Sequence, residues 1–78
     1  MNSENEQRML NVFVKCLSLT GNIDNESLQY NQTTGWDSVG HMTIIAELES
    51  EFDCMLDTDD ILEMSSFSKA VEIMEKYE

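Results

Sequence analysis

Basic residues are scarce in this sequence. Four Lys and Arg stand against sixteen Asp and Glu, which gives a net charge of −12 over 78 residues. A surface of this charge repels nucleic-acid phosphates and anionic lipid headgroups, so we expect neither to be a partner. No apolar run is long enough to cross a bilayer, and residues 1–10 are too polar for a secretory signal. These absences favour a small, monomeric, cytoplasmic protein.

Cysteine and histidine are also too few to build common sites. The two cysteines, Cys16 and Cys54, do not make a disulfide framework, so we expect reduced thiols that pack in the core or at its boundary. The single histidine, His41, and the two scattered cysteines lack the ligand spacing of a zinc site.

A calcium loop is excluded by the residues of the stretch 57–68. Asp57 and Asp59 occupy the first and third positions of such a loop, but Ile61 falls at the fifth. The glycine expected at the sixth position is Leu62, and the final glutamate is a serine. The sequence therefore predicts no metal site.

The acidic residues gather in one part of the chain. Residues 37–63 contain no Lys or Arg and hold nine acids: Asp37, Glu47, Glu49, Glu51, Asp53, Asp57, Asp59, Asp60 and Glu63. Such a run is either a solubilising face or a docking surface for partners with basic patches. We expect Glu49, Glu51, Asp53, Asp59 and Asp60 to take part in docking.

Helical periodicity accounts for most of the chain. A first helix is expected from a capping box at Ser3 and Glu6 to a stop at residues 20–22. A second is expected over 38–52, a short third over 57–64 with Asp57 or Thr58 as its cap, and a fourth over 65–77. The expected buried positions are Leu10, Phe13, Val14 and Leu17, then Val39, Met42, Ile45, Leu48 and Phe52, and finally Phe67, Ala70, Val71, Met74 and Tyr77.

These helices predict an all-α fold, a small four-helix bundle that forms one domain over residues 1–78. Three helices are longer, the third is short, and a long loop over 20–36 joins the first two. Long loops without structure of their own are usually functional or disordered. This one holds enough apolar residues to pack on the helices (Ile23, Leu28, Tyr30 and Trp36), and we expect Trp36 to anchor it. We also expect an adaptable, methionine-containing core around Met42, Ile45, Ile61, Met64 and Val71.

The loop ends in Gly35-Trp36-Asp37-Ser38, at the head of the second helix. Asp37 suits the N-cap, which places Ser38 in the first turn, where backbone N–H groups lack partners. A phosphate on Ser38 would lie by those donors and by the positive end of the helix dipole, and Asp37 could help to hold a magnesium ion during its transfer. A hydrolase would need His41 as base and a buried acid to orient it. We favour a modified serine and an exposed, polar His41.

The chain from residue 35 to 77 resembles the acyl and peptidyl carrier proteins. The family signature, Gly-x-Asp-Ser-Leu at the start of the second helix, corresponds here to Gly35, Trp36, Asp37, Ser38 and Val39. The resemblance continues through the second helix and the acids at its end, at Ile44, Ile45, Leu48, Glu49, Glu51, Phe52 and Asp53. It then extends to a short acidic third helix and to the Ser65-Ser66 pair that opens the last helix. The first helix and the long loop match only in pattern.

The resemblance implies a protein that other enzymes modify and use, and that is not itself a catalyst. Ser38 would carry 4′-phosphopantetheine from coenzyme A, whose thiol holds acyl or aminoacyl groups as thioesters. The implied partners are a phosphopantetheinyl transferase, a loading ligase, and synthases or transferases of fatty acid or polyketide-type biosynthesis. They would dock beside Ser38, on Val39, Gly40 and His41 and on the acids that follow.

Three residues depart from the family pattern. Val39 replaces the usual Leu, and Gly40 and Thr43 stand where fatty acid synthesis carriers commonly have acids. Gly40 also costs about 1 kcal/mol of helix propensity relative to Ala. The sequence of residues 36–42 is similar to that of stand-alone carriers of specialised pathways. An aminoacyl or peptidyl carrier, an unmodified acidic interaction module and a small hydrolase remain as alternatives.

Overall fold

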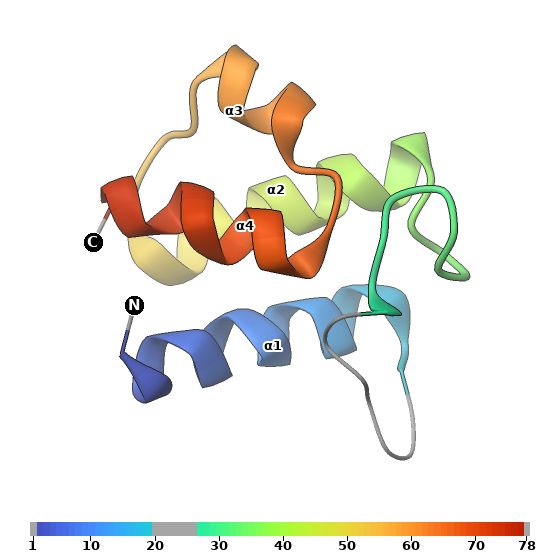
Figure 1. Cartoon of the computed structure of the whole chain (residues 1–78), viewed down its shortest axis with the longest axis horizontal. Helices are drawn as coiled ribbons and strands as arrows, with labels where there is room; N and C mark the ends of the chain where they lie inside the picture. Colours follow the sequence, from blue (N-terminus) through green and yellow to red (C-terminus); the bar gives the residue numbers. More distant parts are fainter. Residues whose placement is uncertain (1, 20–26, 78) are drawn as a thin grey trace.

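The described residues of the chain form four helices that enclose one apolar core, as expected for an all-α bundle (Figure 1). The computed structural model describes residues 2–19 and 27–77. Helix α1 spans Ser3–Leu17, α2 spans Ser38–Phe52, α3 spans Thr58–Glu63 and α4 spans Phe67–Met74, followed by the 3-10 turn η2 at Glu75–Tyr77. In Figure 1, α1 and α2 run in opposite directions, and α3 lies at the top, away from α1. The described residues form no β-strand.

The N-terminus of α1 differs by one residue from the expected cap. Asn2, not Ser3, occupies the N-cap, and its side-chain oxygen accepts a hydrogen bond of 2.8 Å from the Asn5 backbone N–H. Asparagine and serine are about equally good caps, so the sequence did not decide between them. The helix ends at Leu17 because Ser18 adopts a left-handed conformation, with φ 54°. The expected stop at residues 20–22 lies outside the described residues.

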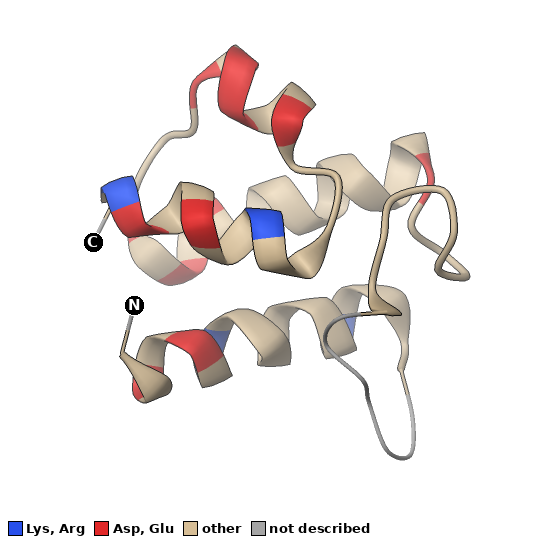
Figure 2. Ribbon diagram, in the orientation of Figure 1, with Lys and Arg blue, Asp and Glu red and all other residues tan. Residues whose placement is uncertain are grey.

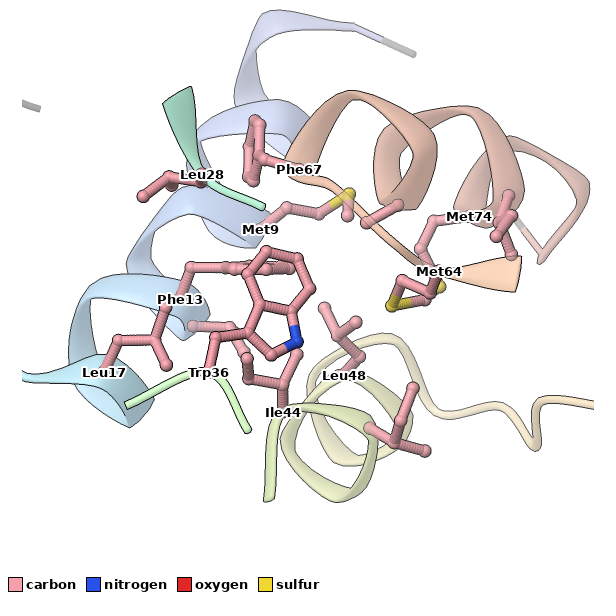
Figure 3. Close-up of a cluster of buried hydrophobic side chains, with 14 of the residues drawn as sticks. Met9, Phe13, Leu17, Leu28, Trp36, Ile44, Leu48, Met64, Phe67 and Met74 are labelled. Atoms are coloured by element: carbon pink, nitrogen blue, oxygen red, sulfur yellow. The ribbon is translucent and has the colours of Figure 1, made fainter. Parts of the chain in front are cut away.

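The core forms around Phe13 of α1, which the sequence predicted correctly as buried. Its ring makes edge-to-face contacts with Trp36 and Phe67, both with centroids 5.1 Å away (Figure 3). Aromatic pairs of this geometry contribute about 0.5–1.5 kcal/mol each beyond their buried area. These contacts join α1, the loop before α2 and the start of α4.

Three expectations about buried faces were wrong in part. In the last helix and the turn after it, Val71 and Tyr77 are half-buried, not buried. On α1, Met9 and Val12 are buried, whereas Leu10 and Val14 are half-buried. Packing against the rest of the core selected a neighbouring row of the same apolar stripe.

On α2 the difference is larger. Ile44, Ile45 and Leu48 are buried, but Val39 is 77% and Met42 is 56% exposed. The apolar residues of α2 surround the helix on more than one side, so its sequence does not define a single buried face.

Candidate functional site

The N-terminus of α2 is built as predicted, with Asp37 as its cap. The Asp37 backbone is extended, and its Oδ1 accepts a hydrogen bond of 2.9 Å from the Gly40 backbone N–H. Ser38 is therefore the first helical residue, and it is exposed. The local sequence alone produces this arrangement, because an aspartate that caps the helix must leave the next residue in the first turn.

The segment before α2 is fixed to the rest of the molecule by backbone hydrogen bonds. The Tyr30 N–H donates to the Ser65 carbonyl over 2.8 Å, and the Phe67 N–H donates to the Leu28 carbonyl over 3.0 Å. Leu28 is buried and Trp36 is 1% exposed, which confirms Trp36 as the anchor of this loop. As a result the Tyr30 hydroxyl lies 3.3 Å from the Ser38 hydroxyl oxygen. Ile23, the other apolar residue expected to pack, lies outside the described residues.

Gly40 has a structural reason that the sequence did not reveal. A Cβ at this position would lie 1.9 Å from the carbonyl oxygen of Gly35, a backbone atom that cannot rotate away. Gly35 itself has φ +88°, a conformation that suits glycine. The loop therefore lies directly against the first turn of α2. Glycine at position 40 permits this close approach because it has no Cβ, although it lowers the helix propensity.

His41 is not the exposed polar residue that we expected. His41 belongs to α2, and its half-buried ring joins the loop before α2 to α3. Nδ1 accepts a hydrogen bond of 2.9 Å from Trp36 Nε1–H, and Nε2 lies 2.8 Å from the Ile61 carbonyl oxygen. Both ring nitrogens are occupied, so neither is available to take a proton from Ser38. The arrangement required of a serine nucleophile and its base is not formed by this pair.

A half-open pocket of about 170 Å³ lies between α2, α3 and the loop. It is lined by Tyr30, His41, Ile61, Leu62, Met64 and Ser65. Tyr30 belongs both to this pocket and to the hydrogen bond with Ser38, so the pocket opens beside the serine. Two of its lining residues, Ile61 and Met64, belong to the adaptable core that the sequence predicted.

Three apolar side chains of α2 and α3 are exposed to solvent. Val39 and Met42 project from α2, and Leu62 of α3 is 77% exposed. We call these three residues the apolar patch. The sequence analysis missed it because the patch residues were assigned to the core or left unassigned. The sequence of α2 did not identify these residues, because Met42 lies only about 60° around the helix from the buried Ile45.

Two basic residues of α1 form ion pairs with acids of the stretch 37–63. Figure 2 shows where the acidic and basic residues lie along the ribbon, with the acids of α3 in red. Arg8 of α1 binds Glu51 over 2.8 Å and lies above the Phe52 ring. Lys15 binds Glu47 over 3.1 Å. Basic residues distant in the sequence thus neutralise part of the expected docking surface.

The expected docking acids consequently differ in their availability. Glu49 is half-buried, and its Oε2 accepts a hydrogen bond of 2.9 Å from the Leu56 backbone N–H. Asp53 ends α2 with a left-handed φ of 51°. Asp59 is exposed on α3, as predicted.

Asp60 is a correction, because it is 5% exposed and cannot present its charge to a partner. Its carboxylate binds Lys76 Nζ over 2.6 Å and accepts a hydrogen bond of 2.5 Å from the Tyr77 hydroxyl. These hydrogen bonds, first that of Lys76 and then that of Tyr77, hold the pKa of Asp60 below its usual value. Asp60 therefore fastens the short helix α3 to the C-terminal turn.

Both cysteines are half-buried at the edge of the core, as predicted. Burial is the main cause that raises the pKa of each thiol, and Glu47 and Glu49 add to the effect at Cys16 and Cys54 respectively. Thiols of this kind are weak nucleophiles at neutral pH.

In the part of the chain that the structure describes, no group of three or more His, Cys, Asp and Glu side chains could hold a metal ion. Over the same residues, no helix is both long and apolar enough to span a membrane. Comparison with known proteins found no protein-family model, no curated protein and no solved structure that matches this chain.

Proposed function

We propose that this chain is a carrier protein that holds acyl groups as thioesters on a 4′-phosphopantetheine arm attached to Ser38. The observation that carries the proposal is the placement of Ser38, which is exposed as the first residue of α2 and directly follows the capping Asp37. An exposed hydroxyl at a helix N-terminus suits a serine that another enzyme modifies.

The chemistry of the site favours a phosphodiester on Ser38. The N–H groups of the first helical turn have no carbonyl partner within the helix, and the helix dipole places partial positive charge there. A phosphate on the Ser38 oxygen would lie beside these donors. Neither nitrogen of His41 is placed to activate Ser38, which supports modification of this serine over its use as a nucleophile.

The surroundings of Ser38 suit enzymes that must hold the protein while they act on the arm. The apolar patch (Val39, Met42 and Leu62) lies beside exposed acids of α3, which include Asp59 and Glu63. An enzyme surface with an apolar centre and a basic rim would complement it. In this proposal such surfaces belong to the transferase, to a loading ligase and to the synthases that use the cargo. The pocket lined by Tyr30 and His41 would receive the atoms nearest the arm.

The absence of acidic residues in the first turns of α2 bears on the type of pathway in which the carrier would act. Between Ser38 and Glu47 the helix presents no carboxylate, so a partner that relies on acids there loses electrostatic steering. We therefore propose a dedicated carrier in a specialised pathway in the cytoplasm.

Two alternatives remain, and one of them has an observation of its own. An aminoacyl or peptidyl carrier would use the same site with a different ligase. An unmodified interaction module is favoured by the apolar patch, because exposed apolar side chains of this size mark contact surfaces.

Incubation with a broad-specificity phosphopantetheinyl transferase and coenzyme A separates these functions. Intact-protein mass spectrometry should show one added arm on the wild type and on Ser50→Ala, an exposed serine of the same helix. It should show none on Ser38→Ala. A wild-type protein that stays unmodified, although circular dichroism shows it to be folded, would exclude the carrier proposal and leave the interaction module.

A further inference from the structure

The hydrogen bonds of His41 define which of its nitrogens carries a proton. The Ile61 carbonyl can only accept, so Nε2, 2.8 Å away, must be the N–H donor. The Trp36 indole N–H can only donate, so Nδ1, 2.9 Å away, must carry no proton. Both bonds exist together only in the neutral ring with its proton on Nε2.

A second proton on this ring would affect the two bonds differently. It would bind to Nδ1 and replace the acceptor for Trp36 with a second donor. The bond from Nε2–H to Ile61 would persist, because that nitrogen donates in both states. Trp36 is 1% exposed, so its indole N–H cannot turn to solvent without moving the ring. Protonation therefore acts on the loop that contains Trp36 and leaves the link to α3 in place.

Titratable groups of the elements packed against the ring are hydrogen-bonded to other partners, and the Trp36 ring is stacked on it with centroids 6.2 Å apart. From the loop, Tyr30 is the titratable neighbour, with its ring centroid 5.3 Å from that of His41 and its hydroxyl at Ser38. From α2, the Asp37 carboxylate is bound to the Gly40 N–H.

The remaining polar groups belong to α3, which contacts the ring through Ile61, and to the connection after it. From α3, the Asp60 carboxylate is bound to Lys76 and Tyr77, and Ser65 adds an uncharged hydroxyl in the pocket. Within the described residues, no hydrogen bond or ion pair joins the His41 ring to a carboxylate.

We propose that His41 is a pH-sensitive clasp that fixes the Trp36 loop to α2 when neutral and releases it when protonated. The released segment leads directly into Asp37 and Ser38, so acidification loosens the support of the N-terminus of α2 while α3 stays attached through Ile61. This inference goes beyond the proposed carrier function and does not rest on it, because it concerns the unmodified chain.

Trp36 is the only tryptophan, which makes its indole a specific reporter. The experiment follows its fluorescence and its indole N–H resonance in the unmodified protein from about pH 8 to about pH 5, the range in which histidine side chains usually titrate. In the wild type, the indole N–H should lose roughly tenfold of its protection against solvent exchange, the amount that one hydrogen bond provides. Protection of the α3 amides should not change with it.

The matched control is His41→Gln, whose amide has both an acceptor and a donor but does not titrate. This variant should lack the transition, and the imidazole nitrogen resonances of the wild type at pH 8 should show an unprotonated Nδ1. An identical transition in His41→Gln, or a proton on Nδ1 at pH 8, would overturn the proposal. Because the nitrogen resonances are measured on the wild type, the test stands even if the variant does not fold.

Discussion

Substitution of Gly40 by alanine separates the local from the tertiary account of this residue, because the two predict opposite signs. Helix propensity alone predicts that Gly40→Ala stabilises the protein by about 1 kcal/mol. The structure predicts the reverse, since the new Cβ would lie 1.9 Å from the Gly35 carbonyl oxygen. Contacts between Cβ and a carbonyl oxygen need roughly 3 Å or more, so the loop must move by about 1 Å.

That movement has a calculable cost. Overpacking of a well-packed site costs about 1–3 kcal/mol, and loss of the Asp37 cap on Gly40 N–H would cost about 1 kcal/mol more. After the gain in propensity is subtracted, the net destabilisation is about 1–3 kcal/mol. For a domain of this size, the thermal midpoint should fall by roughly 5–15 °C.

The assay is thermal and urea unfolding followed by circular dichroism, with Ser50→Ala as control. Ser50 is exposed on the same helix, so alanine there should be neutral or slightly stabilising. A Gly40→Ala variant as stable as the wild type would refute the close approach of the loop. The same clash means that acids near Ser38 should be introduced at the exposed Thr43 and not at Gly40.

Two further predictions concern the acids. The pKa of Asp60 is lowered in the folded chain, so its stabilising effect is present above the ordinary pKa of aspartate, about 3.9, and is lost as the pH falls through the lower folded value. Asp60→Asn should therefore lower the thermal unfolding midpoint at pH 7 and make the midpoint less dependent on pH below about 4. An unchanged midpoint at pH 7 would contradict this role of Asp60. Charge reversal of the exposed Asp59 and Glu63 should slow modification of Ser38 at low salt and have less effect at high salt, because exposed charges act mainly on encounter rates. The control is Glu4→Lys, a charge reversal at an exposed position of α1, and equal rates for all three proteins at low salt would exclude docking through Asp59 and Glu63.

The local sequence determined the helices and the position of Ser38. The bounds of α2 are those that its pattern predicts, and Asp37 caps its first turn as expected. The expected Ser65-Ser66 pair precedes α4, and Ser66 is its N-cap. These features depend on residues within one helical turn, whose hydrogen bonds are the same in any fold. The buried positions of Phe13, Trp36 and Phe67 follow from their size and apolar surface.

Only the tertiary structure decided the roles that depend on distant neighbours. The sequence predicts Asp60 to be a surface acid, but in the fold its carboxylate binds Lys76 and Tyr77. It predicts His41 to be a polar surface residue, but in the fold its two ring nitrogens contact Trp36 and Ile61. From the sequence, Gly40 only lowers the helix propensity, whereas in the fold the Gly35 carbonyl leaves no room for a side chain at this position. In each case the partner comes from another segment, and helical periodicity contains no information about which segment that is. Packing supplies that information, because the bundle must bring α3, the loop and the C-terminal turn around α2 to enclose its core.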